Sequence, residues 1–285
     1  MLILLTTFLC IAIPGVVAWF IAYRWPDKAP TAPKIPVEQV RSEAQQHRPL
    51  VAFLRSRLDP STTTGLALSA ALFAFVGGAL ALILILVMIH TNTGLARLDR
   101  SASLFGAHHA TKLSTHVLKI YTQIGGAFVI VPLAVIVAVV EAIRQRSTTI
   151  VSFIALVLGG EFLIADVIKT IVGRARPAFD QLTGFSGSSF PSGHSAATAA
   201  GFAAFALVLG RRQSLKVRAL LAGLAVGLAT GTACVRVLLG VHWLTDVLGG
   251  LALGWAWFAL CSIAYGGYQL RFGAPVKTAQ DAVSS

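Results

Sequence analysis

Seven apolar segments, each long enough to cross a lipid bilayer, constrain the fold of this chain more than any other feature. A transmembrane helix needs about 17–25 mainly apolar residues. Runs of this kind lie near 2–23, 64–89, 120–142, 149–169, 193–210, 219–239 and 243–265. Only 12% of the 285 residues are charged, whereas a soluble domain carries roughly 25%. The sequence therefore predicts an all-α fold, a polytopic membrane helix bundle with about six core spans and one extra N-terminal span.

The positions of these apolar runs divide the chain into four units. The first apolar run lacks the basic start of a secretory signal peptide and exceeds its usual apolar core, so we expect residues 1–24 to remain as a transmembrane span. Residues 25–62 form a cytoplasmic linker whose second half mixes apolar and basic residues at helical spacing. An interfacial helix and a partly ordered linker both fit that pattern. The membrane domain extends over 63–267, and a cytoplasmic tail over 268–285.

The positions of the charges argue against the nucleic-acid partner that a net charge of +12 would suggest. Lysines and arginines gather at the ends of spans, as at Arg24, at Arg144 and in the segment 211–218. This is the positive-inside pattern of cytoplasmic loops, and it predicts contact with membrane lipids rather than with nucleic acid. Residues 90–119 depart from the pattern, because this basic loop falls on the outer side when the spans are threaded in order.

The same threading brings three polar clusters to the outer face. They are Lys169 with the Arg-Ala-Arg-Pro segment at 174–177, the Pro-Ser-Gly-His turn at 191–194, and the segment from Arg236 to Asp246. Ionisable residues at membrane depth are costly and mark functional sites. Between 219 and 265 the only charged side chains are Arg236 and Asp246, with the titratable His242 between them. We expect a functional site where the three clusters meet.

The third cluster has the spacing of an oriented imidazole. His242 and Asp246 are four residues apart, so on a helix they would occupy adjacent turns of one face. The carboxylate would then accept the Nδ1 proton and leave Nε2 as a nucleophile or a base. Arg236 lies six residues before His242, and a break at Gly240 would let both side chains face one ligand.

The first two clusters have the features of an anion site. Lys169 and Arg176 stand about two helical turns apart, and the proline that follows Arg176 is expected to end the helix there. Ser192 is expected to cap the next helix, whose first N–H groups, at Gly193 and His194, would face an anion. Together the clusters favour a ligand with several anionic oxygens, and a phosphoryl group fits best.

These residues resemble the three signature motifs of the type 2 phosphatidic-acid phosphatase superfamily. The motifs read "KTIVGRARP", "PSGH" and "RVLLGVHWLTD" here, and they occur in the family's order and at its spacing. The resemblance covers about residues 64–266. One position departs from the family, because Val235 stands where the third motif usually has a serine before its arginine.

The resemblance implies a set of roles. His242 would attack phosphorus to form a phosphohistidine, with Asp246 orienting the ring. His194 would protonate the leaving oxygen and then activate water. The phosphoryl oxygens would be held by Lys169, Arg176, Ser192, Gly193 and Arg236. The family needs no metal and no cofactor, and the spacing of cysteines, histidines and carboxylates in this chain shows no metal-ligand motif.

The function expected from this reading is that of an integral-membrane lipid phosphatase. Its substrate would be a lipid phosphate or diphosphate, such as a polyprenyl diphosphate, phosphatidate or phosphatidylglycerol phosphate, at the outer face of a bacterial cell membrane. Two alternatives remain open. One is a lipid phosphotransferase or headgroup transferase that uses the same histidine, and the other is a non-catalytic lipid-binding membrane protein.

Several further polar residues carry weaker expectations. Arg174 would either touch the substrate or be a solvated charge, and Asp166 would pair with Lys169 one turn away. Glu161 would make a hydrogen bond between spans or serve the site. The histidines of the outer loop, His108, His109 and His116, are expected at the membrane interface. The three cysteines, Cys10, Cys234 and Cys261, lie inside spans and are expected to act as small apolar residues.

Overall fold

The computed structural model describes residues 1–24, 63–178, 182–184, 187–211 and 213–272. Their helices are α1 (Leu2–Arg24), α4 (Thr63–Thr91), η1 (Gly94–Leu98), α5 (Asp99–His109), α6 (Lys112–Thr122), η2 (Gln123–Gly125), α7 (Ala127–Gln145), α8 (Thr149–Val172), α9 (Gly193–Gly210), α10 (Leu215–Leu238) and α11 (Leu244–Phe272). No β-strand occurs among these residues. The predicted linker at 25–62 and residues 273–285 of the predicted tail at 268–285 lie outside the described residues, and α11 continues past the predicted start of the tail to Phe272.

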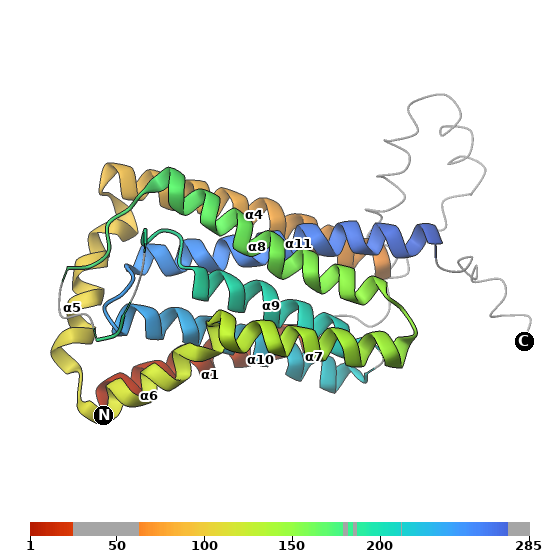
Figure 1. Ribbon diagram of the computed structural model, residues 1–285, viewed down its shortest axis with the longest axis horizontal. Helices are drawn as coiled ribbons and strands as arrows, with labels where there is room; N and C mark the ends of the chain where they lie inside the picture. Colours follow the sequence, from red (N-terminus) through yellow and green to blue (C-terminus); the bar gives the residue numbers. More distant parts are fainter. Residues whose placement is uncertain (25–62, 179–181, 185–186, 212, 273–285) are drawn as a thin grey trace, which may run out of the picture.

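Seven of the described helices are long and apolar enough to span a membrane, namely α1, α4, α7, α8, α9, α10 and α11. They lie roughly side by side along one axis of the bundle (Figure 1). The predicted polytopic helix bundle is therefore confirmed.

One predicted span begins too early. The apolar run at 120–142 is divided in the structure, because α6 ends at Thr122 and α7 begins only at Ala127. Between them Gly126 adopts an extended backbone that the helix cannot continue. A reciprocal capping box between Thr111 and Ser114 defines the other end of α6. The result is a separate short helix at the end of the bundle.

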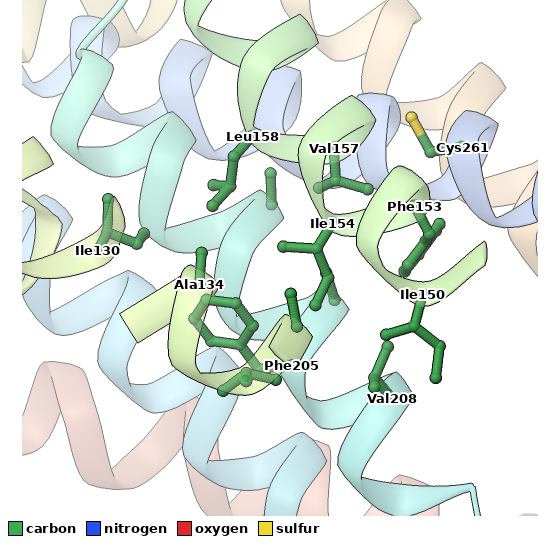
Figure 2. Close-up of a cluster of buried hydrophobic side chains, with 14 of the residues drawn as sticks. Ile130, Ala134, Ile150, Phe153, Ile154, Val157, Leu158, Phe205, Val208 and Cys261 are labelled. Atoms are coloured by element: carbon green, nitrogen blue, oxygen red, sulfur yellow. The ribbon is translucent and has the colours of Figure 1, made fainter. Parts of the chain in front are cut away.

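Helix α9 lies at the centre of the bundle and packs against α7, α8, α10 and α11. Small residues such as Ala197, Ala200 and Ala204 are fully buried in it, and small residues let membrane helices approach closely. The main apolar cluster fills the space between α7, α8 and α9, with Cys261 of α11 at its edge (Figure 2). This packing fixes the position of the α9 N-terminus relative to the ends of its neighbours.

Helix α1 packs along α10 through glycines on both helices. A methyl group added at Gly223 would lie 2.7 Å from the carbonyl oxygen of Gly15, so only glycine permits this approach. The hydroxyl of Thr230 on α10 donates a hydrogen bond to the carbonyl of Cys10, at 2.7 Å. The N-terminal helix is thus closely fitted to the bundle.

The two ends of the bundle differ in their residues. At one end lie the C-termini of α8 and α10, the N-termini of α9 and α11, and the helices α5 and α6 (Figure 1). The basic residues Arg24, Arg144 and Arg211 lie at the opposite end, where α1 ends and where the α7–α8 and α9–α10 connections turn. All three predicted polar clusters belong to the first end.

Candidate active site

The first cluster begins where α8 ends. The predicted helix end near Arg176 is wrong, because α8 stops at Val172 and Gly173 takes a left-handed conformation with φ of +58°. A side chain at this φ would be strained, and glycine is the usual residue at such helix ends. Arg176 therefore lies in the loop beyond the helix. Lys169 remains in the last turn, and a methyl group at Gly193 would lie 3.2 Å from its Nζ.

The second cluster opens α9, with Ser192 at the N-cap position. The predicted side-chain cap is wrong, since the Ser192 hydroxyl makes no cap hydrogen bond and instead accepts one from the hydroxyl of Ser195, at 2.9 Å. The backbone N–H of Ser192 donates to the carbonyl of Asp246, at 3.0 Å. This bond joins the second cluster to the third.

The third cluster turns at Gly240, as predicted. Helix α10 ends at Leu238, and Gly240 has φ of +70°. Arg236 stays in the last turn with 6% of its surface exposed, and its Nη1 is 3.5 Å from the hydroxyl oxygen of Thr122. Its Nε has no hydrogen-bond partner among the described residues. A buried guanidinium with an unused donor suits an anionic ligand.

His242 and Asp246 do not share a helix face as predicted, because α11 begins only at Leu244 and His242 precedes it. Asp246 lies in the first turn, and its Oδ2 accepts the N–H of Trp243 at 2.9 Å. The same oxygen is 3.5 Å from Nδ1 of His242. Burial lowers the pKa of His242 to about 4, so the ring is neutral near pH 7. Nδ1 makes no hydrogen bond among the described residues at this distance, and such catalytic contacts often tighten only when substrate binds.

The hydrogen bonds of Arg176 identify the tautomer of His242. Nη1 of Arg176 lies 3.1 Å from Nε2 of His242, and it also donates to the carbonyl of Val241 at 2.8 Å. A guanidinium has donors only, so Nε2 accepts and the ring proton is on Nδ1, toward Asp246. The lone pair of Nε2 therefore faces Arg176, and it becomes available to attack an electrophile when a ligand takes the place of that guanidinium.

His194 lies among the basic residues of all three clusters. Its ring interacts electrostatically with Lys169, Arg176, Arg236 and His242. A methyl group at Gly126 would lie 3.7 Å from its Nε2, so the turn between α6 and α7 lies against this ring. Residues far apart in the sequence thus form one group of three cations and two imidazoles at one end of the bundle.

The sequence reasoning missed one residue of this region, Asp99, and did not foresee the partners of Arg174. Arg174 is not a solvated charge, because its Nη1 lies 2.6 Å from Oδ1 of Asp246 and its Nη2 lies 2.7 Å from Oδ2 of Asp99. Asp99 is the first residue of α5 and is 4% exposed. One signal was available, since Asp99 is the single acidic residue in the basic segment 90–119.

Glu161 and Asp166 in α8 differ from their expected pairings. Glu161 is fully buried, yet neither carboxyl oxygen has a hydrogen-bond partner among the described residues, so the expected bond between spans is missing. No ion pair joins Asp166 to Lys169 in the part of the chain that the structure describes, although their charges interact.

Replacing Glu161 by methionine is expected to stabilise the protein. An unpaired buried polar group costs about 1–3 kcal/mol, and methionine removes that cost with little change in volume. The thermal midpoint in detergent should rise by a few degrees. Glu141→Met is the matched control, because Glu141 is also buried but accepts from Arg144 at 2.6 Å and should show no gain. A lower midpoint for Glu161→Met would contradict the prediction.

Comparison with known proteins decides the family. Residues 148–268 match the model of the PAP2 superfamily. Phosphatidylglycerophosphatase B of Bacillus subtilis is 35% identical over 144 residues, which are 49% of this chain and 69% of that protein. This chain belongs to the PAP2 superfamily. Asp99 lies outside the matched residues, although it contacts a side chain inside them.

Other PAP2 relatives support the fold and the class of protein. Lipid A 1-phosphatases of Rhizobium johnstonii and Rhizobium etli are 39% and 38% identical over 118 and 130 residues. These matches are 38% and 42% of this chain, and they span only 43% and 50% of the relatives. A crystal structure of a transmembrane PAP2-type phosphatidylglycerolphosphate phosphatase from B. subtilis has a TM-score of 0.64 and 28% identity, over 70% of this chain and 98% of that one.

Proposed function

We propose that this protein is an integral-membrane lipid phosphatase that acts through a phosphohistidine at His242. The observation that carries the proposal is the neutral imidazole whose Nε2 lone pair faces a guanidinium, with two further cations close by. A nucleophilic nitrogen beside converging positive charges suits attack on a phosphoryl group. The phosphatase names of the PAP2 relatives support the same class of reaction.

In the first step the phosphoryl group of the substrate takes the place of Arg176 next to Nε2. Lys169, Arg176 and Arg236 hold its non-bridging oxygens, together with the N-terminus of α9 at Ser192 and Gly193. Nε2 of His242 attacks phosphorus as the bond to the lipid oxygen breaks. His194, which takes up a proton once the negative phosphoryl group offsets the surrounding cations, gives that oxygen a proton. Asp246 stabilises the positive charge that develops on the ring.

In the second step water cleaves the intermediate. His194, now neutral, accepts a proton from a water molecule, and the water oxygen attacks phosphorus. The P–N bond breaks, its electron pair returns to Nε2, and inorganic phosphate leaves. His194 then carries the proton that the next leaving group needs.

The substrate class follows from the position of the site. The group lies at the end of a membrane bundle, so a lipid headgroup reaches it from the bilayer. Polyprenyl diphosphates, phosphatidate and phosphatidylglycerol phosphate all fit. Since basic residues gather at the opposite end, the positive-inside rule favours an extracytoplasmic site in a bacterial cell membrane. The catalytic unit would be residues 63–267, with 1–24, 25–62 and 268–285 as the further units.

Assaying the purified protein tests the proposal. Phosphate release is measured in detergent with a panel of lipid monophosphates and diphosphates, with and without a chelator. We expect release from at least one lipid, undiminished by the chelator. Transfer of phosphate to an added alcohol in place of release would indicate the phosphotransferase alternative. No consumption of any lipid would reject both.

The pH dependence of kcat/KM is expected to reflect the buried environment of His242. Attack requires the neutral ring, and burial lowers its pKa to about 4. Activity should therefore persist as the pH falls below 6 and decline with a midpoint near pH 4, rather than near the ordinary imidazole value of about 6.5. The substrate phosphate also ionises, so its ionisation is measured separately by phosphorus NMR and the pH profile of kcat/KM is corrected for it. A corrected midpoint near 6.5 would contradict this assignment.

A further inference from the structure

A buried group of two carboxylates and one guanidinium holds the start of α11. The exposed fractions of the side chains are 17% for Arg174, 6% for Asp99 and 0% for Asp246. Nη1 of Arg174 donates to Oδ1 of Asp246 at 2.6 Å, and Nη2 donates to Oδ2 of Asp99 at 2.7 Å. One guanidinium thus joins α5 to α11.

Thr245 adds a second connection between the same helices. Its N–H donates to Oδ1 of Asp99 at 2.8 Å, and its hydroxyl donates to Oδ2 of Asp99 at 2.7 Å. The first N–H groups of a helix have no partner within it, so Asp99 caps α11 from another element. The Thr245 oxygen also accepts from Nη1 of Arg174 at 2.7 Å.

We propose that Arg174 and Asp99 form a positioning pair for the reaction, which rests on the proposed function of His242. Arg174 engages Oδ1 of Asp246, so Oδ2 is left to the N–H of Trp243 and to Nδ1 of His242. The rotation of the carboxylate is then fixed, and with it the direction of the imidazole. Asp99 in turn fixes Arg174.

The charges of this group also suit the reaction. Two carboxylates and one guanidinium leave one net negative charge behind His242. Attack on phosphorus places one positive charge on the ring, and the group compensates it. Without Arg174 two buried carboxylates would repel each other, and without Asp99 the negative charge would be cancelled.

Arg174 is distinct from the phosphate-binding arginines in this scheme. Its two terminal nitrogens are taken by Asp99, Thr245 and Asp246, and its guanidinium carbon lies 5.7 Å from the centre of the Trp243 ring. Arg176, two residues later, contacts His242 itself. Arg174 therefore acts through Asp246 and is a positioning residue.

Two variants test the pair. Arg174→Lys keeps the charge but cannot reach both carboxylates as a planar fork does, and Asp99→Asn keeps the shape but removes the ion pair. We expect kcat to fall about 10–100-fold in each, the size typical of a small misplacement of reacting groups. The inhibition constant of orthovanadate, a phosphate analogue, should stay within about twofold because neither residue binds phosphate. Arg97→Lys, at an exposed arginine of the same end, is the control.

The combined variant gives a further check. If Asp99 acts through Arg174, the double variant should be no slower than the worse single variant, because coupled residues are not additive. A loss of kcat in the double variant equal to the product of the two single losses would overturn the pairing. Weakened vanadate binding with kcat retained would instead make Arg174 a phosphate ligand, and an unchanged kcat in both variants would reject a positioning role.

A measurement without turnover separates this inference from the proposed function. Diethyl pyrocarbonate acylates neutral imidazoles, and mass spectrometry measures the extent of acylation of His242 relative to that of His194, the internal reference. This ratio of acylation should differ several-fold between Arg174→Lys and the wild type. An unchanged ratio in a folded variant, judged by its thermal midpoint, rejects the positioning pair. If the wild type releases no phosphate but the acylation ratio still changes in Arg174→Lys, the phosphatase proposal is rejected and the positioning pair is retained.

Discussion

Replacing His242 by asparagine is expected to abolish phosphate release, with a loss in kcat of at least about 10⁴-fold, as for other residues that act as covalent nucleophiles. Asparagine keeps a polar side chain at this position, and Nη1 of Arg176 keeps its hydrogen bond to the carbonyl of Val241. No nitrogen lone pair remains to attack phosphorus. The measurement is phosphate release over hours at high enzyme concentration, with the preferred lipid of the panel.

Orthovanadate binding separates loss of chemistry from loss of structure. His242→Asn should bind vanadate nearly as well as the wild type, because Lys169, Arg176 and Arg236 are unchanged. His116→Asn, an exposed histidine of α6 at the same end of the bundle, should retain full activity. Residual kcat within about tenfold of the wild type would exclude His242 as the nucleophile.

Replacing His194 by asparagine is expected to divide the reaction into its two steps. With lipid substrates, kcat should fall by about 10²–10⁴-fold, the usual contribution of a general acid and base. With p-nitrophenyl phosphate the leaving group needs no proton, so the first step proceeds. Water is then left without its base, and the phosphorylated enzyme should accumulate.

Labelling with a radioactive phosphoryl group tests this accumulation. The label on His194→Asn should be lost in acid and kept in base, as expected for a P–N bond. The double variant with His242→Asn should take up no label. Label that survives acid, or label in the double variant, would place the covalent step on another residue.

Much of the fold could be predicted because lipid leaves the backbone few choices. Each spanning segment must satisfy its own hydrogen bonds, so the apolar runs became helices, and α9 spans the residues predicted for it. The predictions failed where single residues set the local backbone. Gly173 ends α8 four residues before the expected proline, and Gly126 separates α6 from α7 inside an apolar run.

The site shows a similar division. Lys169, Arg236 and His242 could be selected because charge is rare within apolar sequence. The division of labour between Arg174 and Arg176 could not, since the two arginines are alike and lie two residues apart. Their difference depends on Asp99, which α5 brings to α11 across 146 positions of sequence. Neither the helix propensity nor the spacing of residues in the sequence predicts that contact.

The gathering of every reacting group at one end of the bundle gives the proposed reaction a direction. Copies inserted the same way in a liposome would dephosphorylate lipids of a single leaflet. The pool in the other leaflet would then be consumed only as fast as lipids cross the bilayer. Phosphate would accumulate in one compartment, and a lipid carrier restored there would need to flip back before its next cycle.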